Sequence, residues 1–350
     1  MASNCQKILN TFSFFTDSKA MSRRSRQKER EYIPFPIENF ITALKAPVDL
    51  YVKLGDDKFV LLVKRGTKTD SSQLMNYQNK RIDYLWVPKD QFATMSKHNV
   101  IIAGIAVEKK QLNATHKMYF VSAAAHLVFN ELEHLGFTQE GFQRAKEVTE
   151  ATVALTEQNS NLYKLIESLN TLSDALVKHS LAVSALSVLI GQRMGWTNKL
   201  TMEKLALGGM LHDIGLKALP EDLLLKPLSE MSSEEIKIYE THPYKGMEMA
   251  LSLGVVPDDV VSIIYEHQEN AIGQGYPRRI RDVKMHPLAR VVALADAFVK
   301  LVIPNVNHPQ PKSPREAILY IEQTMGLPFN KEAFSALKEI ISDPQMHKIA

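Results

Sequence analysis

Apolar and polar residues alternate along the first third of the chain, a pattern typical of β-strands. Val48–Leu54 alternates in this way and is followed by Gly55-Asp56-Asp57 and then by a second apolar run, Phe59–Val63. Two such runs separated by turn residues predict a β-hairpin. Arg81–Val87 is a third predicted strand. Asn99–Val107 is apolar enough to form either a fourth strand or a buried helix.

The pattern becomes helical after residue 121. Residues 122–170 are rich in helix formers and predict helices that connect two modules. From residue 171 to residue 345, prolines separate the helical segments, which predicts an all-α domain of roughly seven helices. The predicted fold class is therefore α+β overall, with a small α+β module at residues 32–121 ahead of the helical domain. We interpret that module as regulatory or sensory, because it contains no cluster of ligand-type residues.

Residues 1–31 differ from both modules. Arg23–Glu31 is almost entirely polar or charged, so we expect a disordered basic tail, with Met21 as an alternative start to Met1.

Composition narrows the class of protein. A net charge of +3 gives no reason to expect a nucleic-acid polymer as partner. The longest apolar stretch, around Val100–Val107, is too short to span a bilayer. A single cysteine, Cys5, excludes an internal disulfide and suits a reducing compartment. We therefore expect a cytoplasmic protein with no membrane partner.

Four predicted helices carry a metal-binding side chain on their apolar face. Apolar residues at three- and four-residue spacing lead to His179, His212, His267 and Asp296. A single histidine on such a face is more often a packed core residue than a ligand. Asp296 and Asp213 are different, because a buried carboxylate needs a compensating cation. We find no Lys or Arg on the same faces, so a metal ion is the expected source of that charge.

Histidine and carboxylate ligands without cysteine favour Fe, Mn or Zn. With Asp213 and His242 included, the candidate ligands are more numerous than a single catalytic zinc uses, which favours two metal ions. In the adjacent pair His212-Asp213, the imidazole can bind one ion while the carboxylate bridges both. Such a centre activates water for phosphoester hydrolysis and needs no Ser or Cys nucleophile.

The order of these residues resembles the HD-GYP family, bacterial hydrolases of cyclic di-GMP within the HD superfamily. The matching residues are His179, His212-Asp213, His242-Pro243, His267, Gly273-x-Gly275-Tyr276-Pro277 and Asp296. The resemblance implies that the histidines together with Asp213 and Asp296 bind iron or manganese, with Asp213 as the bridging and catalytic carboxylate. It also implies that Gly275, Tyr276 and Pro277 shape the substrate pocket. Arg290 becomes either a phosphate contact or a member of a salt bridge.

Several positions depart from the family pattern. The family usually has Lys directly after His-Asp-x-Gly, but here Leu216 occupies that position and Lys217 follows it. On a helix, one residue rotates the side chain by about 100°, so Lys217 is a displaced candidate for the catalytic phosphate contact. Gln268 replaces a second histidine and is a poorer ligand for Fe or Mn.

Three further departures involve acidic residues. Ile272 and Val299 each replace an aspartate. Ala175 replaces a glutamate that binds a third metal in some members, so we expect two divalent ions, Fe or Mn.

The resemblance implies a cyclic di-GMP phosphodiesterase regulated by the amino-terminal module, which is also a candidate site for a protein partner. The altered positions leave two alternatives open. One is a weakly active or inactive cyclic-dinucleotide receptor or scaffold, and the other is an HD hydrolase of another nucleotide.

Overall fold

The computed structural model describes residues 31–41, 44–55, 58–69, 77, 82–158, 169 and 174–342. The predicted basic tail lies outside the described residues except for Glu31. The predicted turn residues Asp56 and Asp57 and the first residue of the third predicted strand, Arg81, also lie outside them.

The amino-terminal module is built on one antiparallel four-stranded sheet. Its strands are β1 (Tyr32–Pro36), β2 (Leu50–Gly55), β3 (Lys58–Val63) and β4 (Tyr84–Pro88), in the order β1-β4-β2-β3. The predicted hairpin is confirmed as the β2–β3 pair, and the third predicted strand is β4. Sequence analysis did not predict β1, which contains Pro34 and Pro36. Its position at the sheet edge explains this, because proline is tolerated on a strand that has only one hydrogen-bonded neighbour.

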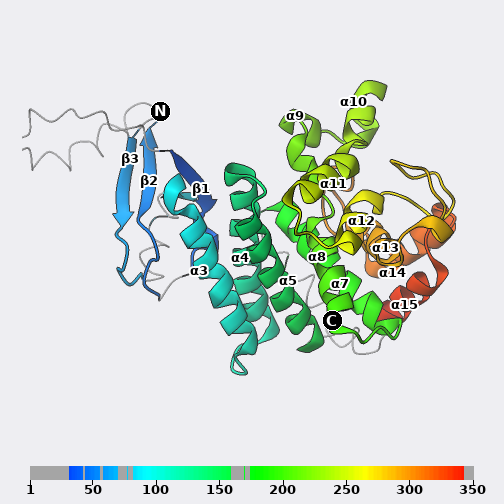
Figure 1. Ribbon diagram of the computed structural model, residues 1–350, viewed down its shortest axis with the longest axis horizontal. Coiled ribbons are helices and arrows are strands. Elements are labelled where there is room, and N and C mark those ends of the chain that lie inside the picture. The colour runs from blue at the N-terminus through cyan, green and yellow to red at the C-terminus, as the bar shows by residue number, and fades with distance from the viewer. Residues whose placement is uncertain are drawn as a thin grey trace, which may run out of the picture.

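Helices α3 (Lys89–Glu108), α4 (Ala114–Leu135) and α5 (Gln139–Gln158) follow the sheet. The apolar run from Asn99 lies in α3, so the helical alternative is correct. The inner face of the sheet packs against Phe92 and Met95 of α3 and against Leu127 of α4. Val100, which lies farther along α3, and Val128, which directly follows Leu127 in α4, belong to the core of the helical domain. Figure 1 shows the sheet at one end of the molecule, these helices in the middle and the remaining helices beyond them.

The predicted boundary between residues 121 and 122 falls inside α4, which runs without interruption through that point. Because α4 contributes to both hydrophobic cores, it joins the two modules as a shared wall.

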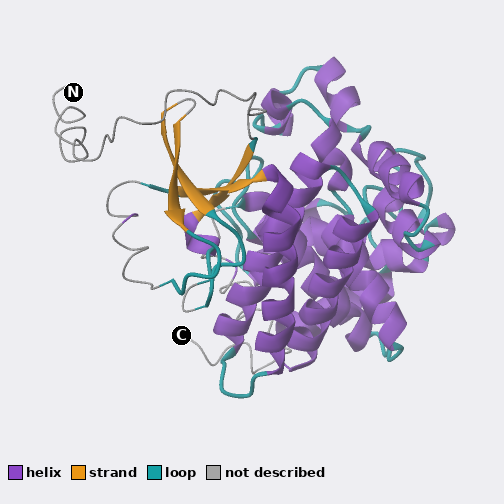
Figure 2. Ribbon diagram, turned by 60° about the vertical axis from the view of Figure 1, so that its left-hand side comes forward, coloured by secondary structure: helices purple, strands orange, loops and turns teal. Residues whose placement is uncertain are grey.

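The α+β fold class is confirmed, since helices make up the rest of the described chain (Figure 2). The α-helices are α7 (Ala175–Arg193), α8 (Lys199–Leu211), α9 (Glu221–Leu224), α10 (Ser233–Tyr239), α11 (His242–Leu253), α12 (Asp258–Glu266), α13 (Pro287–Val302), α14 (Pro314–Leu319) and α15 (Lys331–Ser342). Short 3-10 helices η3 (Ile214–Ala218), η4 (Leu228–Glu230) and η5 (Asp282–Lys284) and a π-helical turn η6 (Tyr320–Thr324) connect them.

Helix α7 lies at the centre of this domain. It crosses α8 so closely that a Cβ on Gly209 would lie 2.8 Å from the Cα of Ser184. Among the described residues, α7 is the one helix long and apolar enough to cross a membrane, but 72% of its apolar window is buried inside the protein. Its apolar character therefore belongs to a core helix, and its position fixes the first predicted metal ligand, His179.

Candidate metal centre

The six predicted histidine and aspartate ligands meet at one place, although they come from five helices. His179 lies in the first turns of α7 and Asp296 lies in the middle of α13. The other four stand at helix ends. His212 and Asp213 follow the last residue of α8, His242 is the first residue of α11, and His267 follows α12.

Asp213 is at the centre of this cluster, with each carboxylate oxygen facing different histidines. Its Oδ2 lies 3.1 Å from Nε2 of His212 and 3.7 Å from Nε2 of His179. Its Oδ1 lies 3.3 Å from Nε2 of His242 and 3.2 Å from Nε2 of His267. Asp213 therefore belongs to two ligand groups, and within each group the candidate ligand atoms lie within 4.8 Å of one another.

Asp296 completes the first group. Its Oδ1 lies 3.0 Å from Nε2 of His179 and 3.5 Å from Nε2 of His212. The first group is thus two histidines with two carboxylates, whereas the second is two histidines with Asp213 alone.

Backbone carbonyls fix the orientation of three of the imidazoles. Nδ1 of His212, His242 and His267 each lies 2.8–2.9 Å from the carbonyl oxygen three residues earlier. A carbonyl only accepts, so each Nδ1 donates a proton to it, and each Nε2 is the ring nitrogen that faces the centre. Such hydrogen bonds to the outer nitrogen are the usual support of metal-binding histidines. They leave Nε2 of His242 and Nε2 of His267 facing each other at 3.2 Å, a contact that a shared cation stabilises.

The two carboxylates are buried and keep their charge. Asp213 is 5% exposed and Asp296 is 3% exposed, and Oδ1 of each has no hydrogen-bond partner among the described residues. Burial raises the pKa of Asp213, but His212 and the nearby His242 and His267 outweigh it and hold that pKa well below its usual range. For Asp296, burial is likewise outweighed by Lys300 and by His179 and His212, so its pKa is also well below its usual range.

The pKa values of His212 and His267 shift in opposite directions. Burial lowers the pKa of His212, but Asp213 and Asp296 raise it by a larger amount, and the net value is about 10. Burial dominates at His267 and lowers its pKa to about 4. Two ionised carboxylates with orphaned oxygens, faced by the Nε2 atoms of the histidines, form a donor set that fits divalent first-row metal ions.

Lys300 is an inward-facing cation that sequence analysis missed. It lies one turn after Asp296 on α13, and its Nζ is 2.6 Å from Oδ2 of Asp296. The expectation that these helix faces carry no Lys or Arg was therefore wrong. The signal was present in the sequence, because residues four apart lie on the same face of a helix. Burial lowers the pKa of Lys300, but Asp296 and Asp213 outweigh it, and the net shift is upward.

Gln268 lies at the edge of the centre. Its Nε2 donates a hydrogen bond to Oδ2 of Asp296 at 3.4 Å. The amide thus contacts the ligand Asp296 from the side that faces Lys300.

Gly215 brings the His-Asp pair against α11. A Cβ at position 215 would overlap the carbonyl oxygen of His242 and press on the backbone of Gly246. Because only glycine permits this approach, Gly215 sets the distance between Asp213 and His242.

The Gly-Tyr-Pro segment forms one wall beside His242. Gly275 packs on the backbone of Gln268 and Glu269 without room for a Cβ, and Gly273 has a φ of +76°. The Tyr276 ring lies edge-on to the His242 ring, 5.9 Å between centroids. Burial, reinforced by Tyr239 and the two aspartates, raises the pKa of Tyr276 well above its usual range, so its hydroxyl stays protonated.

Two buried glutamates, which sequence analysis also missed, hold this segment. Glu269 accepts hydrogen bonds from the backbone N–H of Arg278 at 2.6 Å and of Ile280 at 3.0 Å. Glu266 accepts from the backbone N–H of His286 at 2.6 Å and pairs with Arg278 at 3.1 Å. The loop is thus tied at both its middle and its end to Glu266 and Glu269, which flank His267 at the end of α12.

The structure does not bring Lys217 or Arg290 into the cluster. Lys217 forms an ion pair with Glu133 of α4. Arg290 donates to the carbonyl oxygen of Met285 at 3.0 Å and lies 3.4 Å from Asp282, which is the salt-bridge alternative. In each case a carboxylate on another element pairs with the side-chain cation, which then does not reach the cluster.

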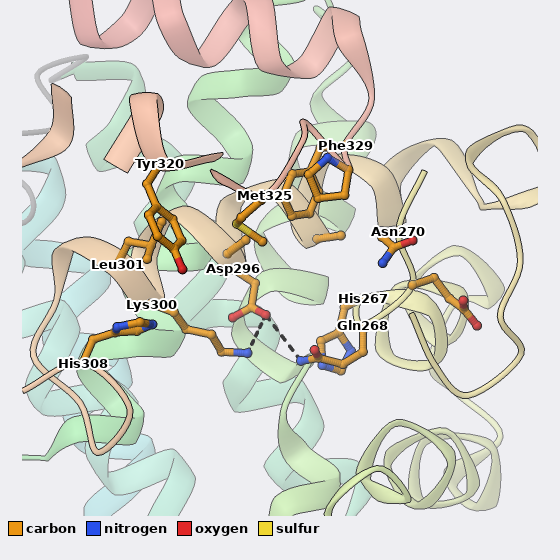
Figure 3. A pocket seen from close by; sticks show the side chains of 14 residues that line it. His267, Gln268, Asn270, Asp296, Lys300, Leu301, His308, Tyr320, Met325 and Phe329 are labelled. Atoms are coloured by element: carbon orange, nitrogen blue, oxygen red, sulfur yellow. Dashed lines mark hydrogen bonds and ion pairs between the residues drawn. The ribbon is translucent and has the colours of Figure 1, made fainter. Parts of the chain in front are cut away.

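A pocket of about 310 Å³ opens beside the centre. His267, Gln268, Asp296 and Lys300 lie on its metal-binding side, and Figure 3 shows Lys300 and Gln268 both reaching the Asp296 carboxylate. Its other lining residues are Glu269, Asn270, Ala293, Ala297, Leu301, His308, Tyr320, Met325, Pro328 and Phe329.

The chain is similar to known proteins in sequence and in fold. The family model described as HD domain matches residues 147–330, more than half of the chain. Cyclic di-GMP phosphodiesterase PA4108 of Pseudomonas aeruginosa is 30% identical over 151 residues, which are 43% of this chain and 36% of that protein. A cyclic di-GMP phosphodiesterase of Thermotoga maritima is 30% identical over 196 residues, which are 54% of this chain and 52% of that protein. The aligned part therefore spans between about a third and a half of these relatives' length.

The fold is similar to a solved structure, that of Bd1817, a HDG"Y"P protein from Bdellovibrio bacteriovorus. The TM-score is 0.68 at 21% sequence identity, over 89% of this chain and 99% of that chain. Since the HD domain model begins only at residue 147, this similarity of fold extends into the amino-terminal module. The chain therefore belongs to the HD domain family, and its motifs and relatives place it in the HD-GYP group.

Proposed function

We propose that this protein is a phosphodiesterase that hydrolyses cyclic di-GMP with a water activated by two divalent metal ions. The observation that carries the proposal is the position of Asp213, whose two oxygens face two separate ligand groups. Support for the substrate comes from the two relatives described above, both of which are cyclic di-GMP phosphodiesterases by name.

Two metal ions in such a centre would lower the pKa of a shared water and neutralise charge on the phosphate oxygens. The protein's own groups supply the rest. Asp213 holds the two ligand groups together, and the carbonyl-bound imidazoles keep their Nε2 atoms aimed inward without reorganisation. Tyr276 and Pro277 wall the site beside His242, and the Tyr276 hydroxyl, which stays protonated, is a hydrogen-bond donor for a substrate oxygen.

Iron or manganese is the metal that we propose, because the donor set is imidazole and carboxylate without thiolate. We propose two ions rather than three, because each ion has a ligand group and the position that would serve a third is Ala175. We further propose a cytoplasmic location, no membrane or nucleic-acid polymer as partner, and regulation through the amino-terminal module, which shares α4 with the HD domain.

The experiment is a product assay on the purified full chain. Metal-stripped protein is reloaded with Mn²⁺ or Fe²⁺, its metal content is measured, and cyclic di-GMP is added while products are followed by chromatography. We expect linear dinucleotide or GMP to form only in the loaded protein. Asp213→Ala should lose both bound metal and turnover, whereas Asp222→Ala, an exposed aspartate of α9, should keep both.

Two results would contradict the proposal. Turnover that survives Asp213→Ala would mean that the site is elsewhere. Tight binding of cyclic di-GMP by loaded protein without any product would leave a receptor rather than an enzyme.

A further inference from the structure

Lys300 stands at the junction between the metal ligands and the pocket. One oxygen of Asp296, Oδ1, faces Nε2 of His179 at 3.0 Å inside the ligand cluster. The other oxygen, Oδ2, faces Nζ of Lys300 at 2.6 Å and Nε2 of Gln268 at 3.4 Å. One oxygen of Asp296 therefore faces the candidate metal ligands, and the other faces the ammonium group of Lys300.

Lys300 is also the one Lys or Arg among the described residues that line the 310 Å³ pocket. The pocket's other acid, Glu269, is already bound to the backbone N–H groups of Arg278 and Ile280. The remaining walls are apolar or neutral, and Figure 3 shows the Lys300 side chain running toward Asp296 and Gln268. Among the described residues that line the pocket, Lys300 is therefore the one Lys or Arg that could pair with a bound anion.

A metal ion at the centre would act on the pair between Lys300 and Asp296. A divalent ion held by Asp296 would neutralise the carboxylate and repel the ammonium group, so the ion and Lys300 would compete for the charge of Asp296. The lysine side chain is 32% exposed and has a flexible four-carbon stem, so its head can turn toward the pocket. A phosphate oxygen then becomes the nearest partner of suitable charge.

We propose that Lys300 is a metal-gated phosphate anchor, which balances Asp296 when metal is absent and binds a substrate phosphate group when metal is bound. The identity of the phosphate as part of a cyclic dinucleotide rests on the proposed function, whereas the competition with metal does not.

The test measures metal and phosphate binding separately from turnover. Mn²⁺ is titrated into metal-stripped wild-type protein and into Lys300→Met, which keeps the apolar stem and removes the charge. Without the competing ammonium, Lys300→Met should bind Mn²⁺ about fivefold more tightly or better, within the usual range of coupling between two sites. Inorganic phosphate is then titrated into the Mn²⁺-loaded proteins, and Lys300→Met should bind it roughly tenfold or more weakly, as expected for a lost hydrogen bond to a charged group.

Two variants make the comparison specific. Lys300→Arg keeps the charge and should bind phosphate within a few-fold of wild type. Lys204→Met removes a lysine that pairs with Asp259 elsewhere in the domain, and it should change neither affinity. Circular dichroism establishes that each variant is folded, and Lys300→Gln replaces Lys300→Met if that protein does not fold.

Weaker or unchanged Mn²⁺ binding in the charge-removed variant would overturn the proposal, because a lysine that merely orients Asp296 gives that result. Unchanged phosphate affinity would overturn it as well, since Lys300 would then not be an anchor. If both affinities move as expected but cyclic di-GMP is not hydrolysed by wild type, the proposed function fails while the role of Lys300 stands.

Discussion

Gly215 packs directly against His242, and a Cβ at position 215 would overlap the His242 carbonyl oxygen. This backbone contact couples the second residue after the His-Asp pair to α11, the helix that begins with His242, another candidate ligand.

Gly215→Ala should therefore push α11 away from the His-Asp pair. We expect a loss of about 1–3 kcal/mol in the free energy of unfolding, as is typical of overpacking, together with weaker Mn²⁺ binding. Urea unfolding and metal titration measure the two effects. Gly104→Ala is the matched control, because a Cβ at that position in α3 meets nothing within 4 Å. Equal behaviour of the two variants would show that the close approach at Gly215 is unimportant.

Glu269 is expected to control the Gly-Tyr-Pro segment without touching the metal ligands. Glu269→Gln replaces one of two acceptor oxygens with an N–H₂ group, which would face the backbone N–H of Arg278 or Ile280. The free energy of unfolding should fall by about 1–3 kcal/mol, because a buried polar group is left unsatisfied. Hydrogen exchange across residues 270–286 should accelerate and the KM for cyclic di-GMP should rise, while metal content stays at the wild-type level.

The control for that experiment is Glu234→Gln, which alters an exposed glutamate of α10. If the Glu269 variant lost metal instead, Glu269 would have to be placed among the residues that hold the centre.

The buried ion pair between Arg144 and Glu131 is expected to hold α4 against α5. Glu131 has a side chain only 2% exposed, and both of its oxygens accept from the Arg144 guanidinium. Arg144→Leu should lower the free energy of unfolding by about 3–5 kcal/mol, because it leaves a buried carboxylate unpaired. The double change Glu131→Leu with Arg144→Leu should be less destabilising than the single one. A double variant as unstable as Arg144→Leu would mean that packing, and not charge, explains the loss.

Asp174 should make the start of α7 sensitive to acid. Burial raises the pKa of Asp174, but hydrogen bonds from His126 and from the backbone N–H of Val177 outweigh it, so the pKa lies below the usual value. A depressed pKa contributes stability above the unfolded value of about 4, and that contribution disappears as the pH falls through the folded value. Asp174→Asn should thus be less stable than wild type at pH 6, and the difference should shrink toward pH 3.

Chemical unfolding at several pH values measures this difference. Asp222→Asn, at an exposed position, should show no comparable trend. If the difference in the free energy of unfolding between wild type and Asp174→Asn were constant from pH 6 to pH 3, the effect would not come from the carboxylate charge.

The sequence by itself determined which side chains could meet. Helix periodicity is local, so the spacing of apolar residues around His179, His267 and Asp296 was enough to place these residues on buried faces. The cost of burying two carboxylates then called for a cation. The same local rule should have found Lys300, which lies four residues after Asp296.

The tertiary structure decided what each polar group faces. Lys217 turns to Glu133 of α4, which is 84 residues away in the sequence. Arg290 turns to Asp282 of η5, which the path of the chain before α13 brings beside it. The division of Asp213 between two ligand groups depends on how five helices cross. Sequence patterns report burial, which is a property of one helix, whereas ion pairs and shared ligands depend on distances between helices that only packing sets.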